Sequence, residues 1–183
     1  MSKTEFEAVL NAKVEAAKEH SQKSVNWEDK KTLWLRALRD FYGLMDSWLS
    51  DYVQTGKIKV ERAEVDIQEE HIGKYSAEMR VLKIGEEQIV FRPIGTLLVG
   101  ARGRVDMEGP KGTVKFILTG KDSNGIRISV TIKGDKQTVP APKPKTKNDR
   151  DFVWKIATPP PNVKFIELNS DSFFDSITEV LNA

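Results

Sequence analysis

The stretch GRVDMEGPKGTVKFILTG, residues 103–120, alternates apolar and polar residues on both sides of a turn rich in glycine and proline. A period of two is typical of strands with one buried face, and the turn between them predicts a β-hairpin. Directly opposed residues of an antiparallel pair share a face, so the apolar faces coincide when Met107 lies opposite Val114. This register predicts a four-residue loop, Gly109–Gly112, because a primed two-residue turn would require a positive φ at proline.

Turns also explain the glycines that precede this hairpin. Gly95 and Gly100 have the spacing of a phosphate-binding P-loop. However, Ala101 and Arg102 stand where that motif needs a lysine and a hydroxyl residue, and no helix follows. The sequence therefore favours turns between strands over a nucleotide site.

The same pairing rule extends the sheet beyond the first hairpin. The apolar faces match if Leu118 lies opposite Val130, which leaves Ser123–Gly125 as a three-residue loop with glycine in the left-handed position. On the polar face of the first hairpin, Asp106 is expected opposite Lys115, where the two side chains can form an ion pair.

Further strands are expected on both sides of these hairpins. Upstream, residues 57–67, 74–84 and 87–93 alternate, and Pro93 indicates a strand end or an edge. Part-way along the first segment, the apolar residues move from even-numbered to odd-numbered positions. One extra residue near Glu61–Arg62 would cause this change of face, so a β-bulge is expected there. Downstream, residues 152–157 and 163–168 predict two more strands.

Helices are expected at both ends of the chain. Residues 4–20 carry one narrow apolar stripe, and residues 170–182 have an amphipathic pattern. The strongest signal is the helix from Trp27 to Gln54, with Asn26 as its N-cap and Gly56 just after its end.

Aromatic residues recur every seven positions along the helix of residues 27–54, and two further apolar rows flank them. Three rows are wider than a coiled-coil seam, so the helix is expected to lie across a sheet and pack against the first helix. Alternatively, the aromatic row fills an interface with a protein partner or a second copy, because tryptophan and tyrosine are favoured interface anchors. The interface candidates are Trp27, Trp34, Phe41 and Trp48.

Together these elements predict an α+β fold, a large antiparallel β-meander of about seven to nine strands covered on one face by N-terminal helices and a C-terminal helix. A single domain is expected over residues 1–183. Its parts are a helical segment (1–56), the meander (57–134), a flexible Pro/Lys-rich loop (135–151) and the final strands and helix (152–183).

The composition narrows the class of protein. Of the 183 residues, 39% are hydrophobic and 31% charged, which suits a folded domain with a real core. The chain has no cysteine, which excludes disulfides, thiolate metal sites and cysteine nucleophiles. Neither a signal peptide nor a long apolar span is apparent, so we expect a cytoplasmic protein that does not bind membranes.

No residue pattern argues for catalysis, a metal or a cofactor. Glu69, Glu70 and His71 are adjacent in a charged turn, and neighbours along a strand point to opposite faces rather than to one ion. Asp106 and Glu108 share a face and could perform acid–base chemistry, as could Glu64 with Asp66. Alternation with apolar residues is more typical of an exposed strand face, so the sequence leans against an enzyme.

Basic residues are concentrated in one third of the chain. Residues 101–151 contain 12 Lys/Arg and 6 Asp/Glu, a net charge of +6. A basic sheet face beside a basic loop could hold a phosphate backbone, although no aromatic residues accompany it for base stacking. The candidate nucleic-acid contacts are Arg102, Arg104, Lys115, Arg127, Lys133, Lys143, Lys145 and Lys147.

Three functions are therefore open. The leading hypothesis is a non-enzymatic module for protein interaction or self-association. The first alternative is electrostatic binding of nucleic acid through residues 102–150. The second is a small-molecule-binding or enzymatic domain with a pocket between sheet and helices.

Overall fold

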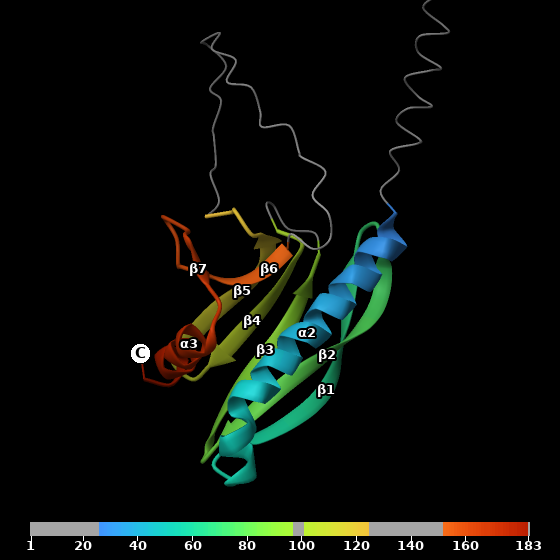
Figure 1. Cartoon of the computed structure of the whole chain (residues 1–183). Helices are drawn as coiled ribbons and strands as arrows, with labels where there is room; N and C mark the ends of the chain where they lie inside the picture. The colour runs from blue at the N-terminus through green and yellow to red at the C-terminus, as the bar shows by residue number, and fades with distance from the viewer. Residues whose placement is uncertain (1–25, 97–100, 125–151, 183) are drawn as a thin grey trace, which may run out of the picture.

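The computed structural model describes residues 26–96, 101–124 and 152–182, and within them the predicted α+β fold is confirmed (Figure 1). One antiparallel sheet has its seven strands in chain order, with a helix before it and a helix after it. The expected helix at residues 4–20 and the expected loop at 135–151 lie outside the described residues. The elements are α2 (Trp27–Gln54), β1 (Lys59–Glu69), β2 (Gly73–Ile84), β3 (Glu87–Gly95), β4 (Gly103–Gly109), β5 (Gly112–Gly120), β6 (Phe152–Ala157), β7 (Phe165–Glu167) and α3 (Ser170–Asn182).

Local signals in the sequence set both ends of α2. The Asn26 side chain accepts a hydrogen bond from the backbone N–H of Asp29, and the acidic first turn complements the helix dipole. Gly56 adopts φ +72° just beyond the last turn, a conformation that glycine reaches without strain. The predicted bounds and both predicted end residues of this helix are therefore confirmed.

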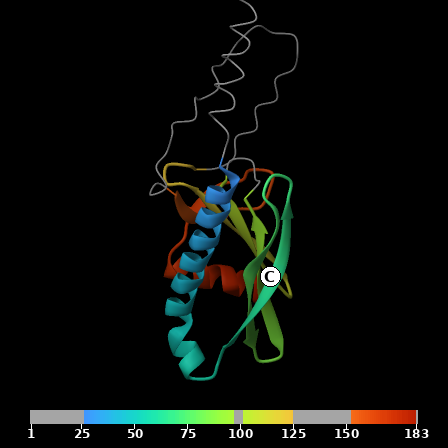
Figure 2. The ribbon, with the colours of Figure 1, turned by 90° about the vertical axis from the view of Figure 1, so that its right-hand side faces the viewer.

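Both helices cover the same face of the sheet, which we call the inner face (Figures 1 and 2). Four phenylalanine rings, one each from α2, β3, β5 and α3, meet there with 0% exposure and with ring centroids 5.1–6.4 Å apart. They are Phe41, Phe91, Phe116 and Phe173. Such ring contacts add to the hydrophobic gain from burial. These rings form the centre of the core between the sheet and the two helices.

The β4–β5 hairpin has the predicted register, with Met107 opposite Val114. Pairing continues to Gly109 opposite Gly112, so the loop is only Pro110 and Lys111, and the predicted four-residue loop is wrong. No non-glycine residue in the described segments has a positive φ, so the turn is not a primed one and proline is tolerated.

The predicted pairing of Leu118 with Val130 is also wrong. Leu118 lies between Gly103 of β4 and Trp154 of β6, so both of its edges are occupied by other strands. Trp154 also has its side chain on the inner face, as the predicted partner would have had. Its indole N–H donates to the carbonyl of Ala37 on α2 at 3.1 Å. The partner of β5 therefore comes from a distant segment rather than from the next one, and residue 130 itself lies outside the described residues.

The predicted β-bulge near Glu61–Arg62 is absent, because β1 and β2 pair without interruption from Lys59–Lys83 to Glu69–Gly73. The change of buried face along β1 is nevertheless real, and β2 changes face at the same point. At one end of the hairpin Val60 and Leu82 pack on the core, and at the other end Val65 and Ala77 do so. A twist of the whole hairpin, rather than an extra residue, changes the face that is buried.

This twist follows from where β2 leaves the sheet. Pairing between β2 and β3 is confined to Arg80–Ile84 and Glu87–Phe91, so the rest of the β1–β2 hairpin forms a two-stranded ribbon. Such ribbons twist more strongly than sheets do. The ribbon tip lies beside the start of α2 (Figure 1). There, His71 stacks on Trp27 with ring centroids 4.6 Å apart. Pro93 lies where β3 has lost β2 as a neighbour, in keeping with the predicted edge position.

Hydrogen bonds at two places, the fork and the tip, hold the ribbon against the sheet. At the fork, the Tyr42 hydroxyl lies 3.0 Å from the carbonyl oxygen of Glu78 and 3.3 Å from that of Phe91, so its proton is shared between the two separating strands. At the tip, the Glu69 carboxylate accepts from the backbone N–H and the hydroxyl of Thr96 and from the Tyr75 hydroxyl. A buried carboxylate needs such donors because burial otherwise disfavours its charge.

These two tyrosines predict a loss of stability at alkaline pH. Burial raises the pKa of Tyr42 more than the charge of Arg80 lowers it; burial and then the Glu69 hydrogen bond raise the pKa of Tyr75. A raised folded-state pKa contributes stability that is complete below the unfolded value of about 10 and is lost as the pH rises above it. We expect the free energy of unfolding, measured in urea, to fall between about pH 10 and about pH 12. Tyr42→Phe should lessen that fall, and an unchanged slope would contradict the assignment.

Candidate ligand pocket on the outer face

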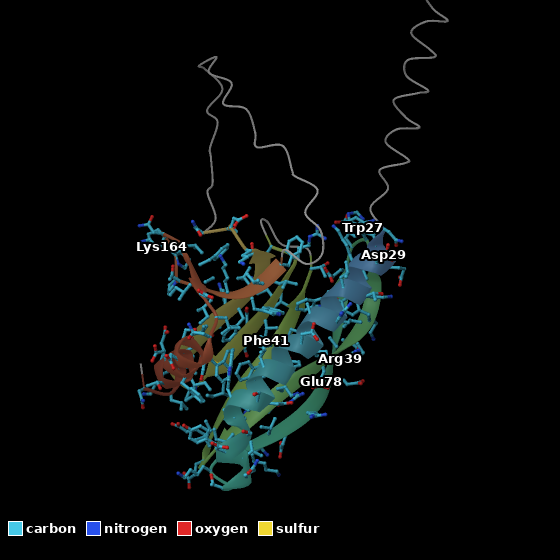
Figure 3. The ribbon with its side chains drawn as sticks, in the orientation of Figure 1. Trp27, Asp29, Arg39, Phe41, Glu78 and Lys164 are labelled. Atoms are coloured by element: carbon cyan, nitrogen blue, oxygen red, sulfur yellow. The ribbon has the colours of Figure 1, made fainter. Side chains whose placement is uncertain are left out.

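The aromatic row of α2 lies mainly inside the protein. Trp34 and Phe41 are 1% and 0% exposed, and Trp48 packs on Phe173. Trp27 lies at the start of the helix (Figure 3) and stacks on His71. This confirms a helix lying across the sheet. Trp34 and Phe41 are not accessible to a partner. The exposed apolar residues that remain on the helix are Leu44, Tyr52 and Val53, and the interface hypothesis stays a prediction.

Three of the eight nucleic-acid candidates lie in the described residues, and two of them are already engaged. The Arg102 guanidinium lies 4.4 Å from the ring centroid of Phe152, and Arg104 is bound to a carboxylate. Lys115 is exposed. The other five, Arg127, Lys133, Lys143, Lys145 and Lys147, lie outside the described residues, so nucleic-acid binding stays a prediction.

The paired carboxylates on the strands serve ion pairs and hydrogen bonds. Asp106 does lie opposite Lys115, but its ion pair is with Arg104, so the predicted Asp106–Lys115 ion pair is wrong. Arg104 and Asp106 are two residues apart on one strand and share a face, which permits a bidentate ion pair with two hydrogen bonds. Glu108 lies 3.5 Å from Arg92 on the next strand.

The other acidic candidates show the same behaviour. Asp66 pairs with Lys74 at 2.7 Å, and Glu64 accepts from the Ser76 hydroxyl. Glu69 points to Thr96 while His71 stacks on Trp27, so the two side chains diverge. No group of three metal-ligating side chains occurs among the residues that the structure describes.

A pocket of about 500 Å³ is lined by residues of β4–β7, of the connector after β6 and of α3. Its floor belongs to the outer face, the face of these strands opposite to the inner face, and Val114, Ile156 and Glu179 of α3 line it from the other side. Strand register builds its floor: Lys115 lies opposite Ala157, which lies opposite Phe165, and Arg104 lies opposite Ile117 in the next row. Directly opposed residues share a face, so these five side chains lie together. The remaining lining residues are Ala101, Thr113, Val114, Ile156, Thr158, Pro159, Pro160, Val163, Ile166 and Glu179.

One wall of the pocket is the connector between β6 and β7. Its base is closed by Thr158, whose backbone N–H donates to the carbonyl of Lys164 at 2.9 Å and whose hydroxyl accepts from the Lys164 N–H at 2.8 Å. Three consecutive prolines, residues 159–161, restrict the backbone between these contacts. The wall is therefore preformed, which reduces the entropy that a bound molecule would have to remove.

The charged side chains that line the pocket differ in whether they already have an ionic partner. Nε and Nη2 of Arg104 donate to the two carboxylate oxygens of Asp106 at 2.7 and 2.9 Å, and Asp106 is only 7% exposed. Lys115, by contrast, has no carboxylate within ion-pair distance among the described residues. Glu179 lines the pocket from α3 and likewise has no cation within that distance in the described segments.

The sequence carries one sign of this pocket, which the predictions did not use. Ile117 interrupts an otherwise polar strand face, and the structure buries it to 7% exposure. Ala157 and Phe165 join it only because β6 pairs with β5, a pairing that the sequence did not indicate.

Comparisons with protein families, curated proteins and solved structures find no match to this chain. None of the helices in the described residues has the length and apolar character needed to cross a membrane. The function therefore has to be argued from the pocket itself.

Proposed function

We propose that the protein binds an amphipathic small molecule in the outer-face pocket. The observation that carries this proposal is the apolar floor of Ile117, Ala157 and Phe165 within a concavity of about 500 Å³. Pockets of about 300–1,000 Å³ with a mainly apolar lining and a few polar groups are typical of small-molecule sites. The two cationic groups of the lining, Arg104 and Lys115, lie on neighbouring strands and on the same face, which suits a ligand with one apolar part and one polar part.

The lining supports binding rather than turnover. Among the residues that the structure describes, the lining contains no histidine, and its hydroxyls are those of Thr113 and Thr158. The Thr158 hydroxyl is engaged in closing the connector, where it also donates to the Asn162 carbonyl. A nucleophile needs a base within hydrogen-bond reach, and the pocket offers Thr113 no histidine for that role.

A ten-carbon alcohol is a suitable first probe, because it tests the apolar floor without any charge. Burial of about 200 Å² of its surface contributes roughly 5 kcal/mol, which corresponds to a dissociation constant on the order of 0.2 mM. Affinities in this range are measured well by two-dimensional amide NMR. We expect decanol to shift the amide signals of residues 113–117 and 156–166 in a saturable way.

A matched pair of variants tests the location. Ala157→Phe fills the floor and should weaken decanol binding by at least about tenfold, since the added ring occupies the space of the ligand. Ala63→Phe places the same ring on an exposed position of β1 and should leave the affinity unchanged. Both variants should keep the circular dichroism spectrum of the parent. Absent or non-saturating shifts, or equal binding by Ala157→Phe and the parent, would refute the proposal.

A further inference from the structure

We infer that the polar end of the ligand is a carboxylate, held between Arg104 and Lys115. This inference rests on the proposed function, since it concerns the same pocket, and it adds the chemical class of the head group. It starts from the charged side chains of the outer face, most of which already have partners.

The cations near the pocket differ in what they can still bind. Arg92 is paired with Glu108, and the buried Lys155 ammonium donates to the carbonyls of Lys121 and Ser123 at 2.7 and 2.8 Å. Neither residue lines the pocket. In the described part of the chain, the cations that line the pocket are Arg104 and Lys115, so an anionic group there would meet these two.

Arg104 is held in place by its contact with Asp106. The contact uses Nε and Nη2 and fixes the plane of the guanidinium, while its side chain stays 26% exposed beside the pocket. A guanidinium has five N–H donors in a planar fork. Beyond the two bonds to Asp106, the donors on Nη1 and the second one on Nη2 have no hydrogen-bond partner among the described residues. A planar fork suits a carboxylate, which can accept two parallel hydrogen bonds.

Lys115 completes this end of the site. It lies on β5 directly opposite Asp106, and Asp106 in turn is two residues from Arg104 on the same face of β4. Opposed side chains have Cβ atoms about 4.5–5.5 Å apart, and diagonal neighbours are about 7–8 Å apart. Both cationic groups can therefore reach one carboxylate, and Lys115 has no competing carboxylate of its own in the described part of the chain.

The acidic groups at the pocket limit how much negative charge a ligand can carry. Asp106 is paired with Arg104 and Glu179 also lines the pocket, so two carboxylates accompany the two cations. A monoanion can lie against the cations at one end, with its apolar chain running towards Phe165 and Val163. A dianion such as a phosphate monoester would carry a second charge towards Asp106 and Glu179, which disfavours it.

The test compares three ligands with the same ten-carbon chain: decanoate, decanol and decyl phosphate. We expect decanoate to bind the parent protein at least about tenfold more tightly than decanol and more tightly than decyl phosphate. The advantage over decanol should shrink below about pH 4.5, where the carboxylic acid is protonated. Titration calorimetry or the amide shifts described above measure all three affinities.

Four variants connect the preference to the named side chains. Lys115→Met should reduce decanoate affinity at least about fivefold with decanol unchanged, and Arg104→Lys, which keeps the charge but loses the fork, should act in the same direction. Glu179→Gln should strengthen decanoate binding by removing a like charge. Lys121→Met is the matched control, because this lysine is exposed and does not line the pocket.

The outcomes separate the inference from the proposed function. Decanol binding in the pocket with no advantage for decanoate, or with a preference for decyl phosphate, overturns the carboxylate inference and leaves the proposed function intact. Failure of all three ligands to bind refutes both. A decanoate preference that survives Lys115→Met and Arg104→Lys also overturns the assignment of the head-group site.

Discussion

Arg80→Ala is expected to destabilise the protein by about 2–4 kcal/mol, whereas Arg62→Ala should cost less than about 1 kcal/mol. The two arginines are directly opposed on β2 and β1, and both contact Asp46 of α2. They form a matched pair, because they differ mainly in burial and in geometry. The side chain of Arg80 is 5% exposed and that of Arg62 is 66% exposed.

Burial decides the difference between these two arginines. Arg80 lies 2.7 Å from Asp46, also donates to Glu78, and stacks over the Tyr42 ring with its guanidinium carbon 4.8 Å from the centroid. Removing it leaves two partly buried carboxylates without their cation and empties the space above Tyr42. Arg62 lies 3.8 Å from Asp46 in solvent, where water screens the attraction.

Urea unfolding of the two single variants measures the difference directly. Arg80→Met separates the causes, since it keeps most of the packing and removes the charge, and it should fall between the parent and Arg80→Ala. Circular dichroism and an unchanged urea slope would show that each variant still unfolds in one step. Equal losses in Arg80→Ala and Arg62→Ala would contradict this account of how α2 is tied to the ribbon.

Predictions from sequence succeeded where the deciding contacts are local. Asn26 and Gly56 delimit α2 through groups within a few residues of the helix ends, and the alternation around Pro110 fixed the pairing of Met107 with Val114. In each case the physical cause, a cap or a shared strand face, lies within one short segment.

They failed where the cause lies in distant parts of the chain. Leu118 pairs with Trp154 rather than with Val130. Either partner would place apolar residues on the same face of the sheet, and only the assembled sheet selects between them. The change of buried face along β1 could not be told from a bulge, because a twisting ribbon produces the same pattern when its partner strand changes face at the same point. The outer-face pocket depends on β5–β6 pairing and so could not be located beforehand, although Ile117 on a polar face was a visible sign of it.

Gly103→Ala is expected to cost about 3 kcal/mol or more, although it adds a single methyl group. A Cβ at this position would lie 2.3 Å from Cε3 and Cζ3 of Trp34, far inside the contact distance of two carbon atoms. The indole cannot easily move aside, since it is 1% exposed and lies beside Trp154 with ring centroids 6.0 Å apart. Interiors are close-packed, so the methyl group displaces either the indole or the strand.

Gly112 on the neighbouring strand provides the control, because a Cβ there meets no atom within 4 Å and neither glycine has a positive φ. Gly112→Ala should therefore change the free energy of unfolding by less than about 1 kcal/mol. Trp34→Leu supplies the decisive comparison: with the indole gone, adding Gly103→Ala should cost at least about 1 kcal/mol less than it does in the parent. If the two changes add without coupling, or if Gly103→Ala and Gly112→Ala unfold at the same urea concentration, Trp34 does not pack directly on β4, and the assignment of this row of α2 to the core rather than to a partner is wrong.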